Sequence, residues 1–268
     1  MNTLPFKFCD SVISAIDDFG HLPELAYAIS PRYCKKWKAV MEDHISNRKV
    51  IEISFSTNNK VEDLRKIKKK HLRISSIFWF GESLSANDIE VLKYVKEFGQ
   101  CSYLYMDDKT ASPTSEDKAR FAEYLKDISL YRISLYYPNE ALIRHHANSK
   151  FLQRFLLFGN RWSEEVQPVI EEILLRNPLE DAFICPSFYF ENEFLEKLFD
   201  VPCLMSKKKS FCIWIDTETF DEFCDFRPNL QIEKTEEKVI WQRDDGVQVS
   251  MELSTCGCTM FNFSKETV

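Results

Sequence analysis

Glycine is scarce in this chain, with six residues among 268. Loops that hold phosphates need glycine, because a residue without a Cβ lets the backbone approach the ligand closely. Neither a Walker loop nor a G-x-G-x-x-G fingerprint occurs, and the G-x-S-x-G and protein-kinase motifs are missing too. These absences argue against the common nucleotide-dependent enzymes and serine hydrolases, and we expect a protein that is not an enzyme.

Cysteine pairs at metal-binding spacing are also missing. The nine Cys are scattered, no C-x-x-C pair occurs, and several stand inside apolar runs such as Phe211-Cys212-Ile213. Buried thiols in a reducing compartment fit this pattern best. The triplet Cys256-Gly257-Cys258 has no further ligands at a recognisable spacing, and the five His form no H-x-x-x-H pair. We therefore predict neither a metal nor another cofactor.

Long apolar segments are absent as well. No stretch of about 18 apolar residues occurs, and the N-terminus lacks a basic segment followed by a long apolar one. We expect a soluble protein of the cytoplasm or nucleus, without a membrane partner. The net charge of −7 disfavours a nucleic-acid-binding face. The basic run Arg65–Arg73 is interrupted by Ile67 and Leu72. A solvated helix face that leads into the next strand explains it better than a nuclear-localisation signal or a nucleic-acid patch does.

Apolar residues recur in one frame, L-x-x-L-x-L, along the middle of the chain. The clearest copy lies in Leu152–Asn160, where Leu152, Phe155 and Leu157 fill the apolar positions and Asn160 follows. Copies begin at residues 74, 101, 130, 152, 179 and, more weakly, 208, so successive gaps are 27, 29, 22, 27 and 29 residues. Leucine-rich repeats have this frame, with periods of about 20–29 residues.

Helical patterns fill the segments between the copies. Ser85, the triplet Ser112-Pro113-Thr114 and Ser163 can each cap a helix, and apolar residues at helical spacing follow. A repeated strand and helix gives parallel strands joined by right-handed crossovers. Two folds fit this pattern: a curved leucine-rich-repeat-like solenoid and an open doubly wound α/β sheet.

The repeated frame favours the solenoid, because a doubly wound sheet need not repeat one frame and usually carries a Gly-rich first turn. We therefore predict an α/β fold in which residues 47–235 form a leucine-rich-repeat-like solenoid of about six strand-helix units. Residues 1–46 form a small all-α unit before it. Residues 236–268 form a C-terminal β-hairpin cap, since Asp245-Gly246 is a type I′ turn signal.

Known motifs stand at the N-terminus. Leu4-Pro5 opens the chain, Leu22-Pro23-Glu24-Leu25 follows, and Tyr33–Val40 (YCKKWKAV) closes the segment. This order resembles an F-box, and residues 5–12 and 37–49 resemble the expanded nematode F-box families. The resemblance implies a three-helix unit that binds the Skp-type adaptor of a cullin ubiquitin ligase. It assigns adaptor binding chiefly to Leu4, Pro5, Phe8, Val12, Leu22, Leu25 and Trp37.

The strand face that points away from the core is the expected partner site. Residues between and just after the last two apolar positions of each frame occupy it, and they are mostly aromatic or apolar where polar residues are usual. Exposed apolar patches mark partner sites, and aromatics are typical anchors. The candidates are Phe78, Phe80, Tyr105, Tyr136, Leu156, Phe158, Phe183 and Trp214. Alternatively, the tail or a loop covers this face, or both sheet faces are buried.

Three functions remain open. The first is a non-enzymatic substrate-recognition subunit of a cullin-type ubiquitin ligase, with an unknown protein substrate on the repeats. In the second, residues 1–46 only cap the repeats, and the chain is a ligase-independent protein-binding module. The third, less expected, is a small-molecule enzyme on a doubly wound sheet, which needs a deep pocket lined by convergent polar groups.

Overall fold

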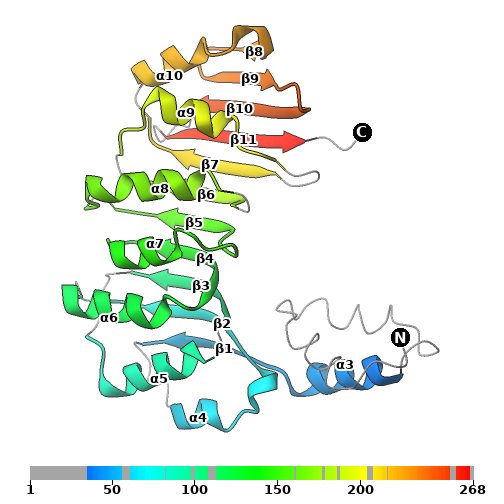
Figure 1. Cartoon of the computed structure of the whole chain (residues 1–268), viewed down its shortest axis with the longest axis vertical. Coiled ribbons are helices and arrows are strands. Elements are labelled where there is room, and N and C mark those ends of the chain that lie inside the picture. Colours follow the sequence, from blue (N-terminus) through cyan, green and yellow to red (C-terminus); the bar gives the residue numbers. More distant parts are fainter. Residues whose placement is uncertain are drawn as a thin grey trace.

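A computed structural model of the chain describes residues 35–55, 61–81, 83–97, 100–107, 113–159, 161–176, 179–185, 188–203, 208–215, 217–253 and 258–265. It is a mixed α/β protein with an open sheet of eleven strands and, in the described part, eight α-helices (Figure 1). Trp37 is within these ranges, as are all the candidates for the partner site. The other adaptor-binding candidates, Leu4, Pro5, Phe8, Val12, Leu22 and Leu25, lie outside the described residues.

The first seven strands are parallel and stand in the sheet in their order along the chain. A doubly wound sheet reverses its strand order at a switch point, and β1 to β7 show no reversal. The strands are β1 (Lys49–Ser54), β2 (Leu72–Trp79), β3 (Gln100–Met106), β4 (Ser129–Leu135), β5 (Arg154–Leu157), β6 (Asp181–Ile184) and β7 (Lys209–Ile213).

Neighbouring strands align the repeated frames position by position. Ile77 of β2 is the partner of Leu104, which is the partner of Ile133, and the same row continues through the next three strands to Phe211. All six members of this row are at most 1% exposed. The alignment follows from burial, because a slip by one residue would turn every apolar side chain to the wrong face.

The helices that follow β2 cover one face of the sheet, whereas the helix before β1 lies to the side of the sheet (Figure 1). Trp79 of β2 packs there against Phe121 of α6, with ring centroids 4.4 Å apart, and both side chains are fully buried. The helices are α3 (Lys35–Asn47), α4 (Val61–Arg65), α5 (Ala86–Lys96), α6 (Ser115–Leu125), α7 (Glu140–His146), α8 (Gln167–Leu174), α9 (Asn192–Phe199) and α10 (Thr217–Cys224).

Side chains cap these helices near the predicted positions. Ser85 and Asp88 form a capping box at the start of α5. Ahead of α6 the cap is Thr114, whose Oγ1 accepts a hydrogen bond from the Asp117 N–H at 3.1 Å. Ser163 caps the short 3₁₀ helix Glu164–Val166, which leads into α8. Thr114, whose hydroxyl follows the proline, therefore caps α6.

Four antiparallel strands extend the sheet beyond β7. They are β8 (Gln231–Lys234), β9 (Lys238–Gln242), β10 (Val247–Leu253) and β11 (Thr259–Lys265). β11 pairs with β7, and β10, β9 and β8 follow outward. The C-terminal strands thus continue the sheet edge to edge, and β1 and β8 are its two outermost strands.

The predicted hairpin turn has a different type. Arg243 N–H donates to the Val247 carbonyl at 2.9 Å, so three residues form the loop. Gly246 has a φ of 81°, whereas Asp245 has no positive φ. A type I′ turn needs positive φ at both central residues, so that prediction is wrong. Asp244 adds the third loop residue, and glycine takes the left-handed position that a three-residue hairpin requires.

Candidate interaction face

Two rows of side chains on β2 to β7 point away from the buried rows. The first row holds the residue between the last two apolar positions of each frame. The strand pairing makes these residues direct neighbours. The second row holds the residue just after each strand, two positions on, so it points the same way. We call these rows the outer face. They consist of Phe78, Tyr105, Ser134, Leu156, Phe183 and Cys212, and of Phe80, Asp107, Tyr136, Phe158, Cys185 and Trp214.

Aromatic rings on the outer face form a continuous band from β2 to β6. The ring centroids lie 6.1 Å apart for Phe80 and Tyr105, 5.2 Å for Tyr105 and Tyr136, 4.2 Å for Tyr136 and Phe158, and 5.2 Å for Phe158 and Phe183. Tyr136 and Phe158 are stacked, with an angle of 11° between their planes. Neighbouring rings restrict each other's orientation, so the band offers a partner an ordered apolar surface.

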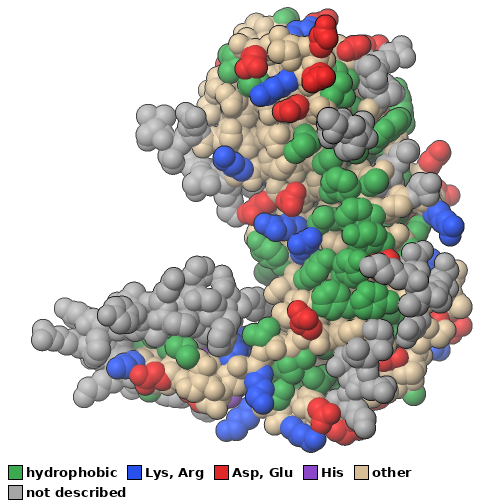
Figure 2. All heavy atoms as spheres, turned by 180° about the vertical axis from the view of Figure 1, so that it is seen from behind, with side chains coloured by type: hydrophobic (Ala, Val, Ile, Leu, Met, Phe, Trp, Pro, Cys, Tyr) green, Lys and Arg blue, Asp and Glu red, His purple; other side chains and the backbone are tan. Residues whose placement is uncertain are grey.

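Solvent reaches this band. Figure 2 shows the sheet from behind, with hydrophobic side chains gathered along its middle. Tyr136 is 37% exposed, and Leu156 and Phe158 are half-buried. By contrast, Phe155 and Leu157 are fully buried under the helices. The residues of β5 therefore alternate between the core and the outer face, as the period of two for a strand requires.

Ser134 is the small residue that lets two tyrosines meet. It lies directly beside Tyr105 in the register of β3 and β4 and two residues before Tyr136. Ser134 is 1% exposed, and its hydroxyl has no hydrogen-bond partner in the described part of the chain. A larger side chain at this position would push the rings of Tyr105 and Tyr136 apart, so Ser134 keeps the band continuous across β4.

Tyr105 is held in place by an acid. Its hydroxyl donates a hydrogen bond to Asp107 Oδ2 at 2.9 Å, and Asp107 is 4% exposed. Burial, together with this carboxylate, raises the pKa of Tyr105. The phenol therefore stays protonated at physiological pH and continues to donate. This contact fixes the ring of Tyr105 within the band.

A polar row runs beside the aromatic band, nearer the starts of the strands. Its members are Ser76, Tyr103, Arg132, Arg154, Asp181 and Ser210. The Arg132 guanidinium lies over the Tyr103 ring, 4.6 Å from its centroid. Sequence reasoning missed this row, although these residues stand two positions before the first outer row and so point the same way. The surface is thus apolar toward the carboxyl ends of the parallel strands and polar toward their amino ends.

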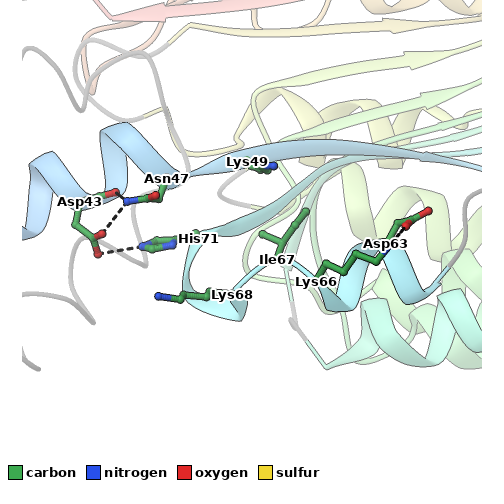
Figure 3. A pocket seen from close by; sticks show the side chains of 8 residues that line it. All are labelled: Asp43, Asn47, Lys49, Asp63, Lys66, Ile67, Lys68 and His71. Carbon is green, nitrogen blue, oxygen red and sulfur yellow. Dashed lines mark hydrogen bonds and ion pairs between the residues drawn. The ribbon is translucent and has the colours of Figure 1, made fainter.

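A cleft of about 400 Å³ lies between the end of α3 and the segment that connects α4 to β2 (Figure 3). Asp43, Asn47, Lys49, Asp63, Lys66, Ile67, Lys68 and His71 line it. The segment Arg65–Arg73 was predicted to be a solvated helix face that leads into the next strand. It does lead into β2, but only its first residue belongs to an α-helix. The end of α4, a 3₁₀ helix at Lys69–His71 and the start of β2 share it, and His71 is 4% exposed.

Ion pairs hold the acids of this cleft. Asp43 Oδ2 lies 2.7 Å from Lys70 Nζ and 3.0 Å from His71 Nε2. The hydrogen bond from Lys70 is the main reason that the pKa of Asp43 falls to about 2, and His71 adds to it. Asp63 is paired with Lys66 at 2.6 Å. Both carboxylates therefore pair with lysine side chains, and the contacts of Asp43 connect α3 to the segment that leads into β2.

The described residues contain neither a metal-binding cluster nor a membrane-spanning helix. No group of three or more His, Cys, Asp or Glu side chains is placed to hold a metal ion there. None of the helices in the same ranges is both long enough and apolar enough to cross a membrane.

No family model, no curated protein and no solved structure matches the chain. The resemblance of residues 1–46 to an F-box therefore stays a prediction. Trp37, which is half-buried on α3, is the adaptor-binding candidate that the structure describes. The choice of the outer face as a candidate site, by contrast, is based on the strand register, ring contacts and exposure that the structure of this chain shows.

Proposed function

We propose that this chain is a non-enzymatic protein-interaction adaptor. The outer face binds a protein substrate, and residues 1–46 bind the Skp-type adaptor of a cullin-type ubiquitin ligase. The observation that carries the proposal is the aromatic band, in which rings from β2 to β6 contact one another on a sheet face with no described helix over it. The chain would act by bringing the substrate to the ligase and would perform no covalent chemistry.

The strand-helix units are, in this proposal, leucine-rich-repeat-like units of a solenoid. Two observations support this reading: the consecutive order of β1 to β7 and the alignment of all six frames across neighbouring strands. Repeats that stack in one direction form extended surfaces on which proteins bind.

The band has the composition of a binding hot spot. Tyrosine and tryptophan are enriched among the residues that contribute most to binding, and such residues cluster where water is excluded. Tyr136 and Phe158 stack at the centre of the band. Because Tyr136 is 37% exposed, a partner can bury further area on it. Truncation of either ring should weaken binding by about 2 kcal/mol, or roughly 30-fold.

The substrate-binding half is tested with matched aromatic variants. Tyr136→Ala with Phe158→Ala removes the centre of the band, and Phe151→Ala with Tyr189→Ala removes two exposed aromatics, 56% and 60% exposed, outside it. Partners of the tagged full-length chain are quantified by mass spectrometry after pull-down. We expect specific partners to be lost in the first variant and kept in the second. Equal recovery with both variants would refute binding through the outer face.

The ligase half is tested with the purified Skp-type adaptor. The wild-type chain should bind it, and Leu4→Ala with Pro5→Ala should abolish that binding without changing partner recovery through the outer face. If the wild-type chain does not bind the adaptor but still loses partners on Tyr136→Ala with Phe158→Ala, the ligase-independent module is the correct function.

A further inference from the structure

Two arginines that form no ion pair with the described residues stand side by side in the polar row. Arg132 of β4 and Arg154 of β5 are direct cross-strand partners, and adjacent strands lie only about 4.8 Å apart. Like charges directly opposite each other destabilise a sheet. Across the described ranges, neither guanidinium forms an ion pair or a hydrogen bond to a side chain or backbone group. Two adjacent arginines without an ion pair are unexpected in a chain whose net charge is −7.

The pair borders the aromatic band. Arg132 stands two residues before Ser134, and Arg154 two residues before Leu156, so both side chains point to the outer face side of the sheet. The Tyr103 ring supports the Arg132 guanidinium, whose Nε is enclosed without a partner. Arg154 is exposed. Figure 2 shows charged side chains along the border of the hydrophobic band. A ligand that covers the band therefore brings its own groups within reach of two guanidinium ions.

An acid on the next strand limits the charge that the pair can take. Asp181 of β6 is the cross-strand partner of Arg154 on the side away from Arg132. Its carboxylate reduces the local positive potential, and this disfavours a dianionic phosphate more than a single carboxylate. Two forked guanidinium donors match the planar geometry of a carboxylate.

We propose that the protein bound on the outer face presents an aspartate or glutamate next to apolar side chains, and that Arg132 and Arg154 bind this carboxylate while the aromatic band takes the apolar residues. This inference rests on the proposed function, because it names the partner chemistry of the same face. The carboxylate relieves the repulsion between the two arginines, so its binding is stronger than that of a lone surface charge.

A random-peptide phage library is the probe. The purified full-length chain is used for selection, and we expect Asp or Glu to be enriched beside aromatic or aliphatic residues. For one selected peptide, fluorescence anisotropy should show about a tenfold weaker affinity with Arg154→Gln and a larger loss when Arg132→Gln is added. Arg120→Gln on α6 is the control, since Arg120 pairs with Glu116 on the helix-covered side, and it should leave the affinity unchanged.

The remaining outcomes separate the inference from the proposed function. Peptides without acidic enrichment, or an affinity that is unchanged in Arg154→Gln, overturn the carboxylate site. The proposed function survives either result if Tyr136→Ala with Phe158→Ala still abolishes binding. If peptide binding persists in that aromatic variant, both are wrong. An empty selection overturns the inference and leaves the proposed function to the pull-down.

Two controls address the charge of the ligand and the stability of the variants. When phosphoserine replaces the acidic residue of the selected peptide, the affinity should fall or stay the same. An affinity more than tenfold higher would show that Arg132 and Arg154 bind a phosphate instead. Because Arg132 packs on Tyr103, Arg132→Gln can lower stability. Arg154→Gln alone changes an exposed side chain and decides the inference even if the double variant does not fold.

Discussion

Burial of His146 predicts that the protein loses stability in mildly acidic solution. His146 ends α7 and is 3% exposed. Burial is the main cause that lowers its pKa from 6.5 to about 4, and repulsion by His145 adds to it, while a backbone hydrogen bond with Leu125 partly opposes both. Its Nε2 is enclosed without a hydrogen-bond partner among the described residues. The folded state therefore holds the neutral ring.

The sign of the effect follows from the folded and unfolded pKa values. Between pH 6.5 and about 4 the unfolded chain protonates this histidine and the folded chain does not. The unfolded state then binds more protons, so the free energy of unfolding falls as the pH falls through this range. The two values differ by about 2.5 pH units, and at 1.36 kcal/mol per unit the full loss is about 3 kcal/mol. Above pH 6.5 the group contributes no pH dependence.

His146→Leu removes the titrating group, and His145→Gln changes its neighbour on the same helix. The free energy of unfolding is measured with urea at pH 7 and pH 4.5 for both variants and the wild type. The wild type and His145→Gln should each lose about 2–3 kcal/mol more than His146→Leu between these pH values. All other groups cancel between the wild type and His146→Leu, whereas His145→Gln should lose slightly less than the wild type because it removes the repulsion by His145. The same pH dependence in His146→Leu and in the wild type would show that the buried ring is not responsible.

Three further predictions concern single contacts. Ser134→Ala should leave the free energy of unfolding unchanged or raise it by up to about 1 kcal/mol, because it removes a buried hydroxyl without a partner; a loss above 1 kcal/mol in urea would mean that the hydroxyl is bonded. Ser85→Ala should lower thermal stability by about 1 kcal/mol through loss of the helix cap, whereas the exposed Ser46→Ala should not, and equal effects would contradict the cap. Asp43→Asn should lose about 1 kcal/mol at pH 7, a value reduced for the partial exposure of Asp43. Because folding lowers the pKa of Asp43, its contribution to the free energy of unfolding is present above the unfolded pKa of 3.8 and is lost as the pH falls through about 2. If Asp43→Asn is still as much less stable than the wild type at pH 2 as at pH 7, the ion pair is not the cause.

The strands were predictable because their apolar residues pair with one another. The frame at Leu152–Leu157 predicts which side chains are buried, and burial then selects the register. The caps at Ser85 and Ser163 were predictable for a local reason, since each hydroxyl bonds to a backbone N–H within three residues. Local rules did not decide between Ser112 and Thr114, because both stand at plausible distances from the helix.

The arginine pair was less accessible from the sequence. Arg132 and Arg154 are 22 residues apart in the chain, and only the pairing of β4 with β5 makes them neighbours. The same limit applies to Asp43, which meets Lys70 and His71 through the arrangement of α3 beside β2. The turn type at Gly246 was predicted wrongly for another reason. Asp244 and Asp245 can both stand in a turn, so the dipeptide Asp245-Gly246 alone does not show how many residues form the loop.

The sheet itself offers a comparison for the aromatic band. The row that contains Phe183 continues across β7 and β11 and reaches Glu252 of β10. The neighbouring row that contains Asp181 reaches Ser250. On β10 the residues that share this side are polar, and they are Gln248, Ser250 and Glu252. This sheet face is thus polar along β10 and aromatic from β2 to β6, although Ile240 of β9 and Met260 of β11 also stand on it beside the β10 residues. Folding alone does not require that difference, because the core lies on the opposite side in both regions. This contrast supports the proposed binding of a protein partner to the parallel part of the sheet rather than to its antiparallel strands.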